Sequence, residues 1–80
     1  MARNIKYKYE IRCYYIHDEL DEVHKFQSED GAKFEALYLA RFYDKVQVYF
    51  IGGITPELIQ EYLNKNGRIY NSKEEEDDGK

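Results

Sequence analysis

The sequence contains no tryptophan, one cysteine, one proline and no apolar run long enough to span a lipid bilayer. The lone Cys13 excludes an intramolecular disulfide framework and suits a reducing compartment. Residues 1–8 are mostly polar and charged, unlike the apolar core of a secretory signal peptide. We therefore expect a cytoplasmic protein that does not cross a membrane.

Hydroxyl nucleophiles are scarce, because the chain has only Ser28, Thr55 and Ser72 apart from its tyrosines. Ser28 and Thr55 precede predicted helices, where such residues serve as caps, and Ser72 opens a charged tail. A serine triad is therefore not expected. Cys13 falls on the predicted inner face of a strand, where a thiol is usually inert core filling. We predict no catalytic residues, no enzymatic activity and no cofactor.

Two short patterns resemble parts of ligand sites. His17 and His24 flank an acidic loop and could meet across a hairpin, but their spacing matches no metal-ligand motif. Gly52–Gly53 precedes a predicted helix start, yet the lysine and the spaced glycines of phosphate-binding loops are absent. We predict no metal site, and a tight turn at the two glycines.

The chain has 80 residues, of which 42% are hydrophobic, with nine tyrosines and four phenylalanines. This length and composition predict one folded domain. The net charge of -4 resides in residues 74–80, which carry five acids and one base, so that the rest has 11 of each. We predict a single domain over residues 1–71 and a disordered acidic tail over residues 72–80.

Three segments have strand character. Residues 5–16 alternate with a period of two, which predicts a half-buried strand whose even-numbered side chains face outward. A polar loop over 17–21 and a short strand over 22–27 follow. Residues 46–51 are apolar on both faces, which is typical of a central strand. We expect the first strand to lie between the other two in an antiparallel-rich sheet.

Ser28 is typical of a helix N-cap, and the following helix is expected to run to about residue 43. This helix is apolar nearly all round, with one stripe of large residues and a second group over most of the remaining surface. The stripe consists of Phe34, Leu37, Tyr38 and Phe42, and the second group of Ala36, Leu39, Ala40 and Tyr43. Such a helix is usually buried on more than one side, so we expect a partner protein or a second copy to cover it.

The sequence Thr55-Pro56-Glu57 has the pattern of a second helix start, and Asn66-Gly67 has that of a helix end. Residues 68–70 then suit a short edge strand. The predicted class is α+β, with an antiparallel-rich sheet of three to four strands in the order ββαβα, an optional final strand, and two helices against the sheet.

Protein binding is the leading functional hypothesis, because tyrosine is favoured at interfaces, where it buries a large area and keeps a polar end. A related hypothesis is a nucleic-acid mimic, which inhibits a DNA- or RNA-handling protein by presenting carboxylates. Acidic residues could form a negative patch at one end of the domain, extended by 74–78, which would steer binding to a basic cleft. The candidate protein-binding residues are Tyr14, Asp18, Glu19, Asp21, Glu22, Glu29, Asp30 and Tyr43.

Nucleic-acid binding is the alternative hypothesis. Lys6, Lys8, Arg12 and Tyr14 form a basic stripe with an aromatic residue on the outward face of the first strand. Basic grooves with stacking rings hold single strands. Glu10 interrupts the stripe, and residues 1–73 have no net charge. We therefore rank direct nucleic-acid binding below protein binding.

The chain is short, rich in tyrosine and mixed α/β, and it has no catalytic motif. In this format it resembles small proteins encoded by phages and mobile elements. The resemblance covers format only. It implies a stoichiometric inhibitor that occludes a host nucleic-acid-processing or defence protein, with anti-CRISPR-like action. The expected partners are therefore a host protein or nucleoprotein complex, and a second copy in a homodimer.

Overall fold

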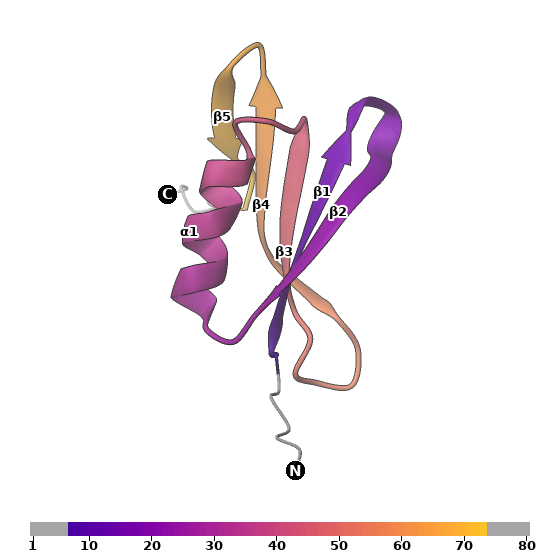
Figure 1. The fold of residues 1–80 in the computed structure, drawn as a ribbon, viewed down its shortest axis with the longest axis vertical. Coiled ribbons are helices and arrows are strands. Elements are labelled where there is room, and N and C mark those ends of the chain that lie inside the picture. Colours follow the sequence, from indigo (N-terminus) through magenta and orange to yellow (C-terminus); the bar gives the residue numbers. More distant parts are fainter. Residues whose placement is uncertain (1–6, 74–80) are drawn as a thin grey trace.

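The computed structural model describes residues 7–73 and shows one α-helix and a five-stranded sheet, which confirms the α+β class (Figure 1). The elements in chain order are β1 (Tyr9–Tyr15), a 3-10 turn (Ile16–Asp18), β2 (Glu19–Phe26), α1 (Glu29–Leu39), β3 (Lys45–Phe50), β4 (Glu57–Lys65) and β5 (Arg68–Asn71). The one helix in this part of the chain is too short to cross a bilayer.

The strands are arranged in the order β2-β1-β3-β4-β5, and every neighbouring pair is antiparallel. The expected position of the first strand between the second and third is therefore confirmed. Tyr9 lies opposite both Phe26 of β2 and Phe50 of β3, and Ile11 lies opposite Val48. The sheet has one or two strands more than predicted, because a segment expected to be helical is a strand.

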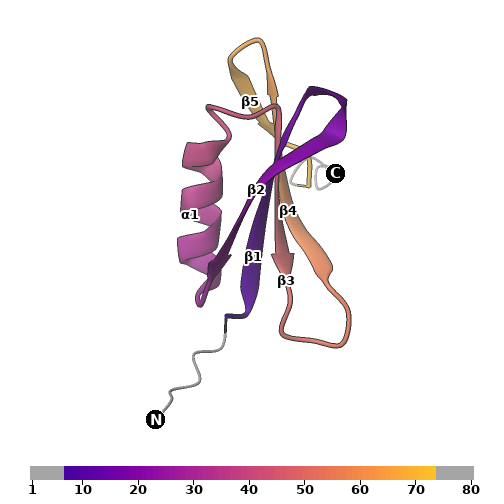
Figure 2. The same cartoon turned by 45° about the vertical axis from the view of Figure 1, so that its right-hand side comes forward.

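Helix α1 lies across one face of the sheet (Figure 2). Ser28 caps it as expected, since its Oγ accepts a hydrogen bond of 3.1 Å from the backbone N–H of Gly31. The side of α1 that faces the sheet consists mainly of alanine: Ala32, Ala36 and Ala40 have no exposed surface. Small side chains let the helix backbone approach the sheet closely, so this side buries little volume of its own.

The core between α1 and the sheet is built mainly from short or medium-sized residues, with two tyrosines among them. Its members are Ile11, Cys13, Ala32, Ala36, Ala40, Tyr43, Val46, Val48 and Tyr62. The odd-numbered residues of β1 point into this core, as their alternation predicted. Its even-numbered residues occupy the other face of the sheet.

The predicted second helix is wrong, because Glu57–Lys65 forms β4. Val48 of β3 lies opposite Gln60 and Tyr49 lies opposite Leu58, so Ile59 is an extra residue in a β-bulge. The bulge breaks the strict alternation and leaves apolar residues at a spacing that resembles one face of a helix. Pairing with β3 and β5 on either side overrides the local helix signal.

Asn66 and Gly67 form a hairpin turn between β4 and β5, not the end of a helix. Their φ angles are 56° and 88°, and the flanking Lys65 and Arg68 lie opposite each other. A two-residue loop with both φ angles positive is a type I′ turn, for which Asn-Gly is the favoured pair. The final edge strand proposed for residues 68–70 is confirmed as β5.

The hairpin between β1 and β2 is tighter than predicted. Its turn spans Ile16–Asp18, so β2 begins at Glu19 and is longer than the expected strand over 22–27. A bulge follows at Asp21, because Cys13 lies opposite Glu22 while Tyr14 lies opposite Leu20. β2 is one edge of the sheet and β5 is the other.

Ser72 belongs to the folded body, although the tail was expected to begin there. Its backbone N–H donates to the carbonyl of Glu61 at 2.9 Å, and its Oγ donates to Glu61 Oε1 at 2.7 Å. The remainder of the predicted acidic tail, residues 74–80, lies outside the described residues.

Candidate functional site

The outer side of α1 and of the turn after it carries large apolar residues. Phe34, Leu37 and Tyr38 lie in α1, which ends at Leu39 and not near residue 43 as expected, and Phe42 lies in the turn. Phe34 is 76% exposed, Phe42 59%, Tyr38 50% and Leu37 45%. The stripe therefore faces away from the sheet, while the alanines face toward it. Within the described residues, no other element covers this side of α1 (Figures 1 and 2). We call these four residues the outer stripe.

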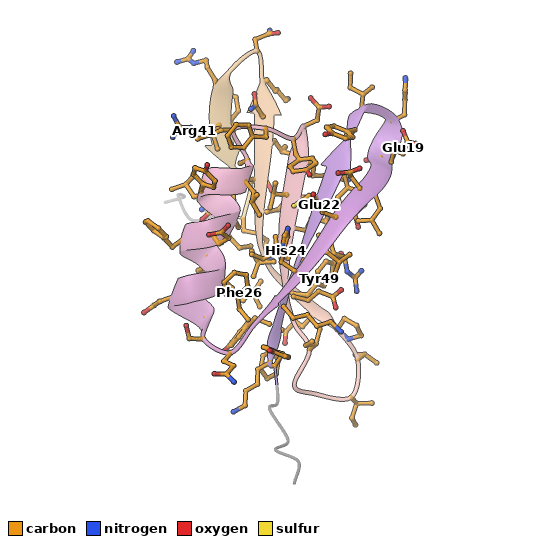
Figure 3. All side chains as sticks on the ribbon, viewed as in Figure 1. Glu19, Glu22, His24, Phe26, Arg41 and Tyr49 are labelled. Atoms are coloured by element: carbon orange, nitrogen blue, oxygen red, sulfur yellow. The ribbon has the colours of Figure 1, made fainter. Side chains whose placement is uncertain are left out.

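A mostly apolar hollow lies beside the outer stripe, between α1 and β5. It has a volume of about 260 Å³ and is lined by Phe34, Leu37, Tyr38, Arg41 and Ile69. Arg41 is the only charged residue of this lining, and it lies just beyond the C-terminal end of α1 (Figure 3). A hollow of this kind can accept an apolar side chain while Arg41 pairs with a neighbouring carboxylate.

Tyr43 lies in the core and not on the surface, which corrects the expectation that it contacts a partner. Tyr43 is only 8% exposed, and its ring packs on that of Tyr15 with 4.8 Å between the ring centroids. Its hydroxyl donates a hydrogen bond of 2.8 Å to Asp21 Oδ2. Burial, followed by this hydrogen bond and the nearby carboxylates, raises the pKa of Tyr43 above its ordinary value. Tyr43 is therefore a core residue in the segment that follows α1.

The acidic candidates do not form one patch at one end of the domain. Asp18 and Glu19 lie at the hairpin tip, where Asp18 pairs with Lys45 at 2.7 Å. Glu29 and Asp30 lie in the first turn of α1, which follows the opposite end of β2. An eight-residue strand, roughly 27 Å long, separates the two pairs.

The two acids within β2 already have partners. Asp21 accepts the hydroxyl proton of Tyr43, and Glu22 contacts His24 Nε2 at 2.9 Å. The labelled Glu19, Glu22 and His24 are spread along β2 in Figure 3. Residues 74–78, which were expected to extend the patch, lie outside the described residues.

The second exposed surface is the sheet face opposite α1, which we call the open face. A polar network crosses it, beginning with the ion pair between Arg12 Nε and Glu10 Oε2 at 2.6 Å. The guanidinium of Arg12 stacks over the ring of Tyr49 at 4.2 Å from its centroid. The network therefore joins β1 to the central strand, β3.

The network continues toward the other edge of the sheet. The hydroxyl of Tyr49 donates to Gln47 Oε1 at 2.9 Å, and Gln47 Nε2 donates to Glu61 Oε2 at 2.8 Å. Glu61 also accepts the hydroxyl proton of Ser72. Six side chains across β1, β3, β4 and the segment after β5 thus hold one another in place, which makes the open face a preorganised surface.

The nucleic-acid candidates lie on or beside this face, as far as they are described. The ammonium group of Lys45 lies over the ring of Tyr14 in β1, 4.8 Å from the ring centroid, and Arg12 stacks on Tyr49. Lys8 precedes β1 and is exposed, whereas Lys6 lies outside the described residues. The structure adds Lys45 and Tyr49. Lys45 lies outside the strand predicted over residues 46–51, and that strand was expected to be apolar on both faces, so neither residue was assigned to this surface.

The remaining reactive groups do not assemble with one another. Cys13 has no exposed surface, and burial, followed by the charges of Glu22 and Asp21, raises the pKa of its thiol to about 12. His17 occupies the hairpin turn, and no group of three or more potential metal ligands lies together in residues 7–73.

Two surfaces therefore stand out: the outer stripe with its adjoining hollow, and the open face with its polar network. They lie on opposite sides of the molecule, because α1 covers the sheet face opposite the network (Figure 2). Comparison with protein-family models, with curated proteins and with solved structures gives no match to this chain.

Proposed function

We propose that this protein is a non-enzymatic binding module that docks onto a target protein through the outer stripe of α1. The observation that carries this proposal is the orientation of the helix. Its alanines are buried against the sheet, whereas Phe34 of the helix and Phe42 of the turn after it are more than half exposed. In a water-soluble monomer the larger residues would ordinarily take the buried side, so an exposed stripe of this kind indicates an interaction site.

The spacing of the outer stripe matches a known mode of recognition. Phe34, Leu37 and Tyr38 lie at positions i, i+3 and i+4 of α1, which is the pattern of a helix that lays its apolar side into a groove. Phe42 lies in the turn after the helix and extends the stripe, with its ring centroid 5.4 Å from that of Tyr38. At about 200 Å² per aromatic side chain, the three rings alone expose roughly 370 Å². An ordinary interface buries about 800 Å² on each partner, so the stripe supplies nearly half of it.

The charges around the stripe define the chemistry of the partner. Asp30 lies one turn before Phe34, and Arg41 lies one turn after Leu37 and Tyr38, so the stripe has an acidic and a basic end. Neither residue forms an ion pair with any other residue between 7 and 73. The matching target has an apolar groove, an apolar side chain that enters the hollow beside Ile69, and a carboxylate that pairs with Arg41.

We further propose that the target is a host nucleic-acid-processing or defence protein and that binding occludes it without turnover. The format of the chain supports this inhibitory role. Inhibition would then titrate near one-to-one, whereas an enzyme would act at substoichiometric amounts. In a homodimer, by contrast, a second copy of this chain would occupy the stripe.

The test compares two substitutions of the same chemical type. Phe34→Asp places a charge in the outer stripe, and Ile54→Asp places one at a side chain that is 99% exposed in the β3–β4 loop. Both residues are exposed, so both variants should keep the wild-type melting temperature. Affinity purification from a nuclease-treated host lysate, followed by a binding titration with the purified partner, measures the effect.

Loss of at least tenfold in affinity with Phe34→Asp, and unchanged affinity with Ile54→Asp, supports docking through the stripe. Equal effects of both substitutions would contradict it. Light scattering on the purified protein distinguishes the second copy: a dimer that Phe34→Asp converts to a monomer assigns the stripe to self-association and overturns the proposal of a heterologous target.

A further inference from the structure

Charge is segregated between the two sides of the sheet, although residues 1–73 contain equal numbers of acidic and basic residues. Because residues directly opposite in paired strands share a face, the register assigns each strand residue to one side. The open face carries Arg12, Lys25, Lys45, Lys65 and Arg68 against Glu10 and Glu61, and Asp18 of the hairpin turn is paired with Lys45. The side that bears α1 carries Asp21, Glu22, Glu29, Asp30 and Glu35 against Lys33 and Arg41. The open face is therefore basic and the α1 side acidic.

Two cations lie directly opposite each other at the end of the β4–β5 hairpin. Lys65 pairs in register with Arg68 on either side of the Asn66–Gly67 turn. Like charges at such positions destabilise a hairpin, and neither side chain forms an ion pair with another residue in the range 7–73. An anionic ligand would neutralise both charges, so this end of the open face is suited to a phosphate group.

Aromatic side chains accompany these cations. Tyr14 and Tyr49 lie on the open face of β1 and β3, and Tyr70, which is 40% exposed, lies on the same face of β5 opposite Leu63. Arg12 presents its guanidinium stacked on Tyr49. Unpaired nucleobases stack on tyrosine rings and on arginine guanidinium planes, which gives binding without strict sequence preference.

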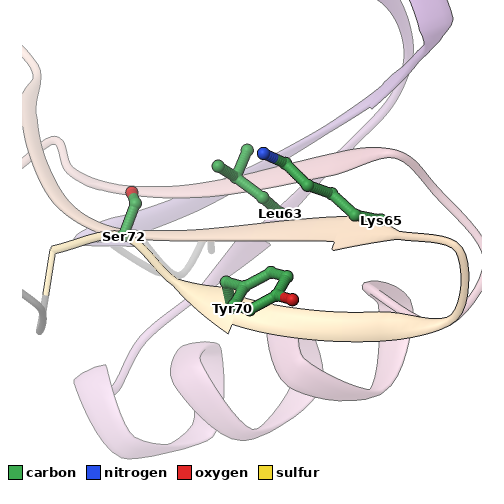
Figure 4. Close-up of a pocket in the computed structure, with 4 residues that line it drawn as sticks. All are labelled: Leu63, Lys65, Tyr70 and Ser72. Atoms are coloured by element: carbon green, nitrogen blue, oxygen red, sulfur yellow. The ribbon is translucent and has the colours of Figure 1, made fainter.

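A hollow between β4 and β5 combines these features in one place. It has a volume of about 220 Å³ and is lined by Leu63, Lys65, Tyr70 and Ser72 (Figure 4). Tyr70 offers a ring, Leu63 an apolar contact and Lys65 an ammonium group. Ser72 offers only a hydroxyl oxygen that can accept, because its proton is donated to Glu61. A base that lies against Tyr70 would have its phosphate within reach of the Lys65–Arg68 pair.

We propose that the open face is a binding site for single-stranded nucleic acid. Lys65 and Arg68 bind phosphate groups, while Tyr70 and the stacked pair of Arg12 and Tyr49 receive bases. These groups lie on β1, β3, β4 and β5, which are neighbours in that order. At the usual strand spacing, the distance from β1 to β5 is roughly 14 Å. This distance admits a few nucleotides that cross the strands.

This site goes beyond docking through α1, because it lies on the opposite face and recognises a different class of molecule. The two proposals can fail separately. A protein that holds a target with α1 would present the open face to nucleic acid carried by that target, which fits a nucleoprotein complex as the partner.

The experiment measures fluorescence anisotropy of a labelled oligothymidylate titrated with the full chain at several salt concentrations. We expect a dissociation constant in the micromolar range at low salt and a linear loss of affinity with the logarithm of salt concentration. Lys65→Gln and Arg68→Gln should each weaken binding severalfold and reduce the salt slope by about 0.7. Tyr70→Ala should weaken binding roughly tenfold through lost stacking.

Lys33→Gln is the matched control, because it removes one positive charge from the α1 side. It should leave the affinity and the salt slope unchanged, as should Phe34→Asp, and circular dichroism checks that every variant is folded. Absence of binding at low salt overturns the proposal, and so does an equal effect of Lys33→Gln. If polyglutamate binds as tightly as oligothymidylate, the face binds acidic proteins and the proposal is overturned. If duplex DNA binds as tightly as oligothymidylate, the tyrosines do not stack on unpaired bases, which contradicts the proposed mode of binding.

Discussion

Cys13 and Tyr43 show how burial changes the chemistry of single residues. Both have an ionisable proton, both lie in the core, and both have a raised pKa. The thiol of Cys13 is held in its neutral form, mainly because the thiolate would lose its hydration. A cysteine of this kind packs as a small apolar residue and does not act as a nucleophile at neutral pH.

The raised pKa values predict a loss of stability at alkaline pH. Cys13 has an unfolded pKa near 9.0 and a folded pKa of about 12, so the unfolded chain releases this proton first. The free energy of unfolding is therefore constant below about pH 9 with respect to this group, and falls from there toward pH 12 by roughly 1 kcal/mol per pH unit. Tyr43 contributes with the same sign at pH values above its ordinary range.

Urea unfolding of the wild type and of Cys13→Ala at pH 7, 9 and 10.5 measures this effect. Cys13→Ala should be less stable at pH 7, because it loses buried volume, but its stability should fall less steeply above pH 9. Parallel pH profiles for the two proteins would show that Cys13 does not titrate in this way. Iodoacetamide should label Cys13 in urea and leave the folded protein almost unlabelled.

At the scale of elements, α1 has its size pattern reversed relative to an ordinary surface helix. The small residues face the core and the large ones face outward. The sequence showed that the helix is apolar nearly all round, but periodicity alone gives two apolar sides and does not say which one faces the sheet. The close packing of helix on sheet selects the alanine side, because larger residues would not fit there.

This reversal predicts opposite outcomes for two substitutions in α1. Ala36→Leu adds volume where no surface is exposed, and should destabilise the protein by about 1–3 kcal/mol. Phe34→Ala removes a large side chain that is mostly exposed, and should change stability by less than about 0.5 kcal/mol. Thermal or urea unfolding of both variants distinguishes the two sides. A large loss in Phe34→Ala with a tolerated Ala36→Leu would mean that the opposite side of α1 faces the sheet.

β4 shows why one element was assigned incorrectly from local pattern. Thr55-Pro56-Glu57 and Asn66-Gly67 are good helix boundaries, and both also suit the ends of a strand. The bulge at Ile59 removes the alternation by which a strand is recognised. With pairing partners on both sides, the segment gains more as a strand than as a separate helix.

At the scale of the whole molecule, a balanced composition conceals two differently charged sides. The open face is basic, the α1 side is acidic, and residues 74–80 add five acids and one base to the chain. Long-range electrostatic effects on an anionic ligand depend on all of these charges, whereas short-range contacts depend only on the open face.

Removal of residues 74–80 changes the formal net charge from -4 to 0, because it leaves 11 acids and 11 bases. We expect oligothymidylate to bind severalfold more tightly at low salt to the shortened chain, and the difference to vanish at high salt. A full-length chain in which the five acids become the corresponding amides is the control. It should reproduce the shortened chain; if it resembles the wild type instead, charge is not the cause.

The sequence by itself determined the α+β class, β1 with its inward and outward faces, the capped start of α1, and the final edge strand. Each of these depends on a local signal: strict alternation, an N-cap serine, or a short apolar run before a polar tail. The order of the first three strands also followed, because consecutive antiparallel strands and a helical crossover allow few arrangements.

Tertiary structure alone decided the nature of β4, the side of α1 that is buried, the position of Tyr43 in the core, and the separation of charge between the two faces. The physical reason is common to all four. They depend on which residues lie opposite one another across strands or across the helix–sheet interface. These pairings are set by register, bulges and packing between segments distant in sequence, which composition and periodicity do not encode.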